Sequence, residues 1–116
     1  MKISGWTRLW MAAVPLFTAC TPANREGNFA YACYLGPLDN RTVEVRWSEN
    51  GYRADTTIEG RSYVFRFDSA DWMTETLKDQ SGALLAIDPE LIFTPAPGAE
   101  HSVCNPGSKF FRQPSP

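Results

Sequence analysis

The chain has 116 residues, and its 11 basic and 13 acidic side chains give a formal charge of −2 at pH 7. A chain of this length holds one small domain and leaves little material for a second hydrophobic core. The mildly acidic balance argues against a nucleic-acid partner and against electrostatic attraction to anionic lipids, since both require excess positive charge.

The first twenty residues are organised like an export signal that ends in a lipid-modified cysteine. Lys2 and Arg8 precede or flank the uncharged run "LWMAAVPLF" (residues 9–17), and two small residues stand directly before Cys20. The run is too short for a membrane-spanning helix, which needs ~20 apolar residues. This order of basic residues, an apolar run, small residues and a cysteine resembles a signal peptide with a bacterial lipobox. We therefore expect residues 1–19 to be a lipoprotein signal peptide and Cys20 to be lipidated. The alternative is an ordinary secreted protein with a spare thiol.

The residues after the cysteine bear on the location of such a lipoprotein. In Gram-negative lipoproteins an aspartate at this position tends to retain the protein at the inner membrane, whereas this chain has Thr21. The resemblance therefore implies the outer membrane, with the domain facing the periplasm and held by its acyl chains. The stretch "TPANREGN" is polar, and we expect residues 20–28 to be a lipidated tether. Removal of residues 1–19 would leave 97 residues with a formal charge of −4.

The other two cysteines, Cys33 and Cys104, lie near the two ends of the remaining sequence. Exported proteins fold in an oxidising compartment, so we expect one disulfide between them. Closing this loop of 71 positions stabilises the fold by roughly 4 kcal/mol, because it lowers the entropy of the unfolded chain. The alternatives are two free thiols or a metal site with His101, but one histidine and two distant cysteines do not have the spacing of a zinc site.

Residues 42–58 carry the clearest local pattern, that of a β-hairpin. The stretch "TVEVRW" alternates apolar and polar residues, and Asn50-Gly51 is the strongest short hairpin turn. If these two residues form the loop, the residue numbers of each cross-strand pair add up to 101. This register places Val43, Val45 and Trp47 on one face and sets Arg46 opposite Asp55 on the other, as an opposite-charge pair.

The rest of the domain is also predicted to consist mainly of short strands. The stretch "YVFRF" (residues 63–67) alternates after a turn at residues 59–62, and the stretches "LIFT" (91–94) and "HSVC" (101–104) have strand composition. Residues 69–82 fit either a helix capped by Ser69 or a strand over residues 72–78 followed by a turn into "ALLAI"; the threonines and the neighbouring hairpins favour the strand.

These elements predict an all-β fold, a small antiparallel β-barrel or sandwich of six to eight short strands with one disulfide. We expect the β-domain to occupy residues 29–104 and residues 105–116 to form a flexible tail. Within this tail, Phe110 and Phe111 could dock against the domain.

The sequence has no enzyme motif that we recognise. It contains no nucleophile elbow, glycine-rich phosphate loop or metal-binding histidine pair, so we expect no enzyme activity, metal or cofactor. Asp68, Asp71 and Asp88 could supply a catalytic carboxylate pair, but acids beside Pro, Ser and Gly are more typical of turns. His101 is expected to be solvated or at the edge of the core rather than catalytic. The aromatic residues could form a sugar-stacking face, but we expect them in the core: Trp47, Tyr63, Phe65, Phe67 and Trp72.

The order of features resembles the membrane-bound inhibitors of C-type lysozyme, a family of antiparallel β-barrels in Gram-negative periplasms. The resemblance rests on the lipobox, on Tyr31-Ala32-Cys33 at the start of the domain, on the short antiparallel strands, on Cys104 near its end and on the stretch "EGRSY". That stretch matches the family's Ser-Gly-x-x-Tyr loop motif at Gly60 and Tyr63, with Glu59 in the serine position. The family's Lys-Gly-acid motif is not present; "KDQSG" holds similar residues in another order. The resemblance implies loops that enter the lysozyme active-site cleft.

The function expected from this resemblance is that of a lipid-anchored periplasmic binding module that inhibits a lysozyme. The contact residues would be Gly60, Arg61, Ser62 and Tyr63, which could donate hydrogen bonds to the catalytic carboxylates of a basic enzyme. Glu59 would repel the same carboxylates. Two other functions stay open: an accessory lipoprotein of an envelope assembly for secretion, pili or polymer export, and an exclusion or immunity lipoprotein of a mobile element.

Overall fold

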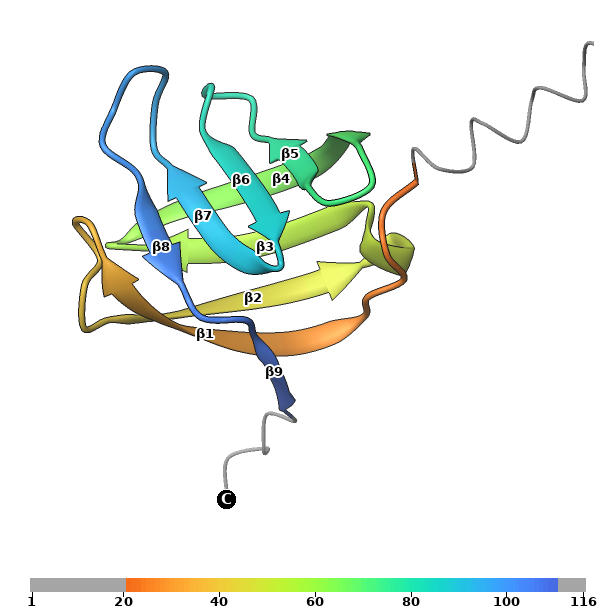
Figure 1. Ribbon diagram of the computed structural model, residues 1–116, viewed down its shortest axis with the longest axis horizontal. Coiled ribbons are helices and arrows are strands. Elements are labelled where there is room, and N and C mark those ends of the chain that lie inside the picture. Colours follow the sequence, from red (N-terminus) through yellow and green to blue (C-terminus); the bar gives the residue numbers. More distant parts are fainter. Residues whose placement is uncertain (1–20, 111–116) are drawn as a thin grey trace, which may run out of the picture.

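The computed structural model describes residues 21–110, and this part of the chain folds as a series of antiparallel strands (Figure 1). The predicted signal peptide, Cys20 and residues 111–116 lie outside the described residues. The strands are β1 (Gly27–Leu35), β2 (Thr42–Ser48), β3 (Arg53–Ile58), β4 (Arg61–Ala70), β5 (Glu75–Lys78), β6 (Leu84–Asp88), β7 (Glu90–Thr94), β8 (Ser102–Cys104) and β9 (Ser108–Phe110).

Strands β1 to β8 close into a barrel, which confirms the predicted all-β class. Each strand from β2 to β7 pairs with the next along the chain, and β1 closes the ring by pairing with both β8 and β2. Strand β9 adds to the outside of this ring, because residues 108–110 pair with residues 28–30 of β1. The sequence did not predict β9, which lies inside the segment that we expected to be a flexible tail.

The β2–β3 hairpin has the predicted register. Val45 pairs with Thr56 and Trp47 with Ala54, and the apolar members face the core. Asn50 and Gly51 have positive φ angles of 57° and 92°, as a two-residue Asn-Gly turn requires.

The expected charge pair on the outer face of this hairpin does not form. Arg46 lies opposite Asp55 in the register. The Asp55 carboxylate instead accepts hydrogen bonds of 2.8 and 3.2 Å from the guanidinium of Arg53, two positions earlier in the same strand. Since i and i+2 share one face of a strand, this neighbour competes with the cross-strand partner.

The barrel interior is filled by every second side chain along the strands, the ones that point inward. Phe65 packs against Tyr63 and Phe93, and the indole N–H of Trp47 donates a 2.9 Å hydrogen bond to the hydroxyl of Tyr31. Within residues 21–110 no buried side-chain nitrogen or oxygen atom lacks a hydrogen-bond partner, as a packed interior requires. The largest fully buried apolar side chains are Trp47, Phe65, Leu77, Leu85, Leu91 and Val45.

The ambiguous segment, residues 69–82, is a strand rather than a helix, but the strand starts later than predicted. Strand β5 begins at Glu75, because the preceding residues form a turn around Asp71, whose carboxylate accepts hydrogen bonds from the N–H groups of Met73 and Thr74. This turn places Trp72 at its tip with 89% of its surface exposed. The expectation that Trp72 belongs to the core is therefore wrong.

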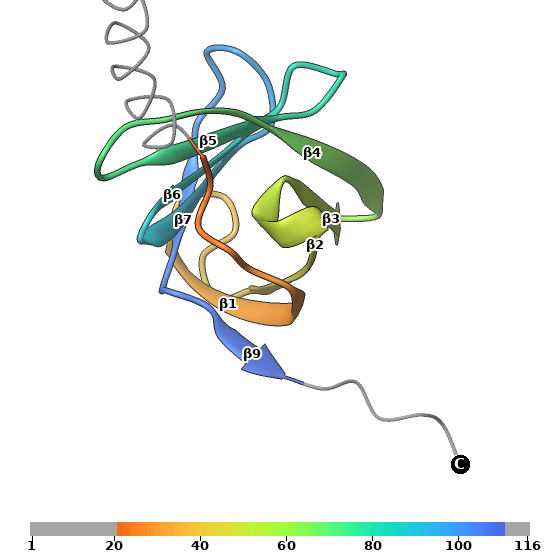
Figure 2. The ribbon, with the colours of Figure 1, turned by 90° about the vertical axis from the view of Figure 1, so that its right-hand side faces the viewer.

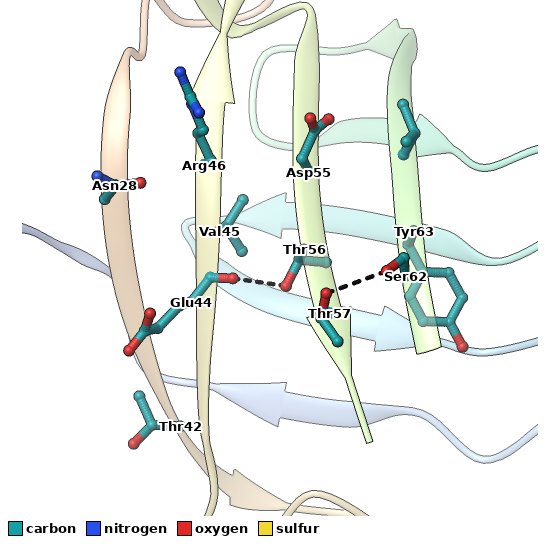
Figure 3. A pocket seen from close by; sticks show the side chains of 11 residues that line it. Asn28, Thr42, Glu44, Val45, Arg46, Asp55, Thr56, Thr57, Ser62 and Tyr63 are labelled. Carbon is teal, nitrogen blue, oxygen red and sulfur yellow. Dashed lines mark hydrogen bonds between the residues drawn. The ribbon is translucent and has the colours of Figure 1, made fainter. Parts of the chain in front are cut away.

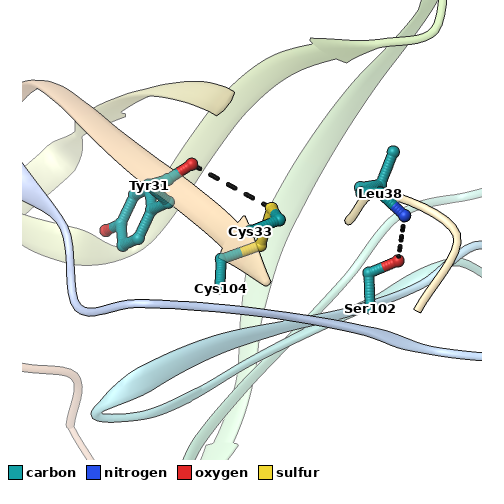
Figure 4. Close-up of a disulfide and its surroundings, with 5 residues drawn as sticks. All are labelled: Tyr31, Cys33, Leu38, Ser102 and Cys104. Carbon is teal, nitrogen blue, oxygen red and sulfur yellow. Dashed lines mark hydrogen bonds between the residues drawn. A yellow bond between two sulfur atoms is a disulfide. The ribbon is translucent and has the colours of Figure 1, made fainter. Parts of the chain in front are cut away.

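Cys33 and Cys104 form the predicted disulfide. The two residues lie opposite each other on β1 and β8, the first and last strands of the closed ring (Figure 4). Beside this bond, the backbone N–H of Leu38 donates a 3.0 Å hydrogen bond to the hydroxyl of Ser102. The disulfide thus links the two strands whose pairing closes the ring.

Residues 21–26, which we call the N-terminal segment, pack against the barrel instead of forming a free tether. In Figure 2 this orange segment runs across one end of the barrel, beside the β2–β3 turn. Arg25 makes a two-pronged ion pair with Glu75, with distances of 3.1 and 3.2 Å, and its guanidinium lies 4.6 Å from the ring centre of Trp47. The N–H of Ala23 also donates to Glu75 at 3.2 Å. This segment therefore covers what we call the N-terminal end of the barrel.

Candidate partner-binding site

The β3–β4 connection is a two-residue turn at the end of the barrel opposite the N-terminal segment. Ile58 pairs with Arg61, and the two residues between them, Glu59 and Gly60, have positive φ angles of 52° and 81°. Positive φ at both positions is the geometry of a type I′ turn, which follows the twist of the flanking strands. The turn predicted from "EGRS" is confirmed, although Glu59 is an unusual residue in this conformation.

The structure separates the four predicted contact residues into two groups. Gly60 stands at the tip of the turn, and Arg61 and Ser62 are exposed at the start of β4. The hydroxyl of Ser62 lies 3.3 Å from that of Thr57 on the outer face of the barrel (Figure 3). Tyr63 is only 5% exposed and belongs to the core, so its ring cannot be a protruding contact.

A pocket of about 210 Å³ opens at this end, which we call the pocket end. Its floor is aromatic, because Tyr63 and Phe93 meet edge to face with ring centres 5.2 Å apart. Its wall is formed by the β1–β2, β3–β4 and β7–β8 connections, three segments that are distant in sequence. The lining residues are Pro37, Leu38, Ile58, Glu59, Arg61, Tyr63, Phe93, Pro95, Glu100 and Ser102.

The charges at the pocket end are partly balanced. Glu59 makes an ion pair with Arg41 at 3.3 Å, and the two side chains are 54% and 60% exposed. Arg61 places its guanidinium 5.2 Å from the ring centre of Tyr63, within the range of a cation–π interaction. Because Glu59 has its own cationic partner, Arg61 is available to meet an anionic group.

Asp79 provides a further charge near Arg61. Burial acts to raise the pKa of Asp79, but hydrogen bonds from Ser81 and from the N–H of Val64, together with the nearby charge of Arg61, hold this pKa below its ordinary value. Asp79 is therefore ionised at neutral pH, and its charge interacts favourably with the nearby charge of Arg61.

A second hollow lies on the outer face of β2, β3 and β4 (Figure 3). It is larger, about 650 Å³, but its lining is formed by outward-facing polar side chains such as Glu44, Arg46 and Asp55. The hydroxyl of Thr56 donates a 2.7 Å hydrogen bond to the Glu44 carbonyl across this surface. Ligand sites are usually concave and largely apolar with a few polar groups, a description that fits the smaller pocket better.

Sequence reasoning identified the β3–β4 turn but missed the other half of the pocket. Leu38, Pro95 and Glu100 come from connections that have no motif, and only the closure of the barrel brings them beside Arg61. The hydrogen bond from Leu38 to Ser102 fixes one of these connections against another. A single apolar residue among turn-forming residues, such as Leu38 in "GPLDN", is the one signal that could have indicated a loop packed against the barrel.

The residues considered for catalysis or metal binding are scattered. Asp68 makes an ion pair with Lys78 at 3.5 Å, Asp71 is used in its turn, and His101 is exposed. Within residues 21–110 no group of three or more His, Cys, Asp or Glu side chains could hold a metal ion. In the same part of the chain no helix is long and apolar enough to cross a membrane.

Comparison with known proteins adds no assignment. No family model matches the sequence, no curated protein matches it, and no solved structure matches it at a significant level. The site is therefore interpreted from its own geometry.

Proposed function

We propose that this protein is a lipid-anchored periplasmic binding module that holds a protein partner at its pocket end. The observation that supports this proposal is the difference between the two ends of the barrel. The chain enters at the N-terminal end, which residues 21–26 cover, whereas the opposite end presents a pocket and the exposed Arg61. A lipid attached at Cys20 would leave the pocket end facing away from the membrane and open to a partner.

We propose a C-type lysozyme as the partner. Removal of the signal peptide would leave an acidic chain, and an acidic domain attracts a basic enzyme. Arg61 lies over the Tyr63 ring, so its guanidinium is presented at the pocket in a restricted position and could donate paired hydrogen bonds to carboxylates in the enzyme's cleft. The ion pair of Glu59 with Arg41 reduces the repulsion that Glu59 would otherwise cause.

A different function, that of an accessory lipoprotein in an envelope assembly, would use a sheet edge that accepts a strand from another protein. Strand β9 stands at the end of the sheet order and pairs with β1. It is only three residues long, however, and short edge strands are a common protection against such pairing. The pocket end is therefore the better candidate.

The inhibitor proposal is tested with the full chain and its Arg61→Ala variant in a lysozyme assay that follows lysis of bacterial cell walls. We expect the substitution to weaken inhibition by about tenfold or more, as the loss of one interface arginine can do. Arg46→Ala is the matched control, because Arg46 is an exposed arginine on the outer face of β2, away from the pocket. It should leave inhibition unchanged, and neither variant should change the melting temperature.

The Glu59→Asn variant provides a second test of the same contact. Asparagine tolerates the positive φ of this turn and removes the negative charge, so inhibition should become stronger. If the wild-type chain at micromolar concentration leaves the lysozyme fully active, the inhibitor proposal is wrong and the envelope-assembly alternative takes its place.

The anchor is tested separately. Mass spectrometry of the protein from a Gram-negative host should find acyl chains on Cys20, and Cys20→Ser should move the protein out of the membrane fraction. An unmodified Cys20 in soluble wild-type protein would refute the anchor without bearing on the pocket.

A further inference from the structure

The tip of the β4–β5 turn presents two large apolar side chains to solvent. Trp72 is 89% exposed and Met73 is 56% exposed. A tryptophan side chain carries about 150–250 Å² of surface that is ordinarily buried in a core or an interface. The same barrel buries Trp47 completely, so the exposure of Trp72 does not reflect a lack of interior positions for aromatic residues. An exposed apolar tip of this kind marks an interaction site.

The tip has a fixed conformation. The carboxylate of Asp71 accepts hydrogen bonds of 2.8 and 2.7 Å from the N–H groups of Met73 and Thr74, and the N–H of Asp71 donates to the Thr74 carbonyl at 3.0 Å. The two backbone hydrogen bonds to its carboxylate lower the pKa of Asp71, so the turn keeps its charge and its geometry at neutral pH. Trp72 is therefore held in its exposed position before it meets any partner.

The tip lies at the N-terminal end of the barrel. Glu75, three residues after Trp72, is the residue that binds Arg25 and the N–H of Ala23. In Figure 1 the β4–β5 connection and the N-terminal segment lie at the same end of the molecule, on the right of the view. Tyr52 adds a third exposed apolar group at this end, and its ring packs edge to face on Phe67.

Chain geometry limits the distance between this tip and a lipid on Cys20. Cys20 stands three positions before Ala23, and Trp72 three positions before Glu75, so each segment spans at most about 11 Å. Because the N–H of Ala23 donates to the Glu75 carboxylate, chain length alone limits the distance of both Cys20 and Trp72 from that carboxylate to about 15 Å. A bilayer that holds the acyl chains would thus be within reach of Trp72.

We propose that Trp72 and Met73 insert into the interfacial layer of the bilayer beside the acyl chains; this inference rests on the proposed anchor at Cys20. Tryptophan prefers the membrane–water interface, and a second contact strengthens attachment by lipid chains. Asp71 stands directly before Trp72, whereas the charges of Asp68 and Glu75 are balanced by Lys78 and Arg25. The charge of Asp71 disfavours an anionic membrane surface, so the tip is suited to zwitterionic lipids such as phosphatidylethanolamine.

The proposal is tested by quenching of tryptophan fluorescence from within the bilayer. The full chain, purified from a Gram-negative host, is placed in vesicles of phosphatidylcholine and phosphatidylethanolamine that contain lipids brominated near the top of the acyl chain. If Cys20 is recovered unacylated, its thiol is coupled to a maleimide lipid, so that an anchor is present in either case. Mass spectrometry of Cys20 then reports on the anchor proposal, and the quenching reports on the tip.

We expect the brominated lipids to reduce the emission of Trp72, measured as wild type minus Trp72→Phe, by about twofold. The matched control is the Trp72→Phe/Leu35→Trp variant, which moves the tryptophan to an exposed position at the pocket end of β1. Its added tryptophan should not be quenched. The proposal is overturned if wild type is quenched no more than Trp72→Phe, or if the tryptophan at position 35 is quenched equally; a partner protein would then be the better explanation for the exposed tip.

Discussion

Replacing Arg25 with alanine should destabilise the barrel even though Arg25 precedes its first strand. Arg25 and Glu75 are each only 15% exposed, and Arg25 also lies over the ring of buried Trp47. Removing one partner of a buried ion pair costs about 3–5 kcal/mol, and an exposed pair contributes about 0–1 kcal/mol. Fifteen per cent exposure places this pair between these limits, and the cation–π contact adds about 0.5–2 kcal/mol. We therefore expect the free energy of unfolding to fall by about 2–4 kcal/mol.

The measurement is urea unfolding of the full chain, followed by the tryptophan emission. The matched control is Arg41→Ala, because the Arg41–Glu59 pair has a similar closest distance, 3.3 Å, but both side chains are more than half exposed. That variant should lose no more than about 0.5 kcal/mol. Arg25→Lys should give an intermediate loss, since lysine keeps the charge but not the two-pronged hydrogen bonding. If Arg25→Ala and Arg41→Ala destabilise the protein equally, the N-terminal segment does not pack on the barrel as described.

Two further predictions concern the core. Replacing Cys33 and Cys104 together with alanine should lower the free energy of unfolding by roughly 4 kcal/mol, because the bond closes a loop of 71 positions; reduced and oxidised wild type unfolding at the same urea concentration would contradict this. Burial raises the pKa of the Tyr31 hydroxyl above 10.0 despite its hydrogen bond from Trp47. The native state thus favours the neutral phenol, so its contribution to stability is complete below pH 10 and is lost as pH rises through the raised pKa. Tyr31→Phe should flatten this alkaline loss in urea unfolding measured as a function of pH.

The sequence predicted those parts of the fold that depend on neighbouring residues. The register of β2 and β3 follows from the Asn50-Gly51 turn and from the alternation of Val43, Val45 and Trp47. Side chains alternate between the two faces of a strand, so with this turn only one register buries the apolar face. The disulfide was predictable from the number and position of the cysteines. Antiparallel strands joined by short turns then favour closure into a barrel or packing into a sandwich, and the sequence does not distinguish the two.

One feature that the sequence analysis missed, the exposure of Trp72, depends on a local turn, and two others depend on contacts between distant residues. Trp72 has strand-like neighbours, and its exposure follows from the hydrogen bonds that Asp71 makes to the next residues. The stretch around Arg25 has the composition of a linker, and its packing follows from the position of Glu75, 50 residues later. The pocket has the same origin: residues 59–63 were identified locally, but Leu38 reaches the pocket only when β1 and β8 come together.

If the chain is anchored at Cys20, the stability of the barrel and its orientation relative to the membrane depend on the same contact. The Arg25–Glu75 pair holds the N-terminal segment on β5, and β5 is joined directly to the turn that exposes Trp72. If the chain is anchored at Cys20, this pair limits rotation of the barrel about its lipid, and the exposed tip limits it further. The pocket end would then face the periplasm because the opposite end is held at more than one point. A free tether would not provide this restriction, since the barrel could then turn in any direction relative to the membrane.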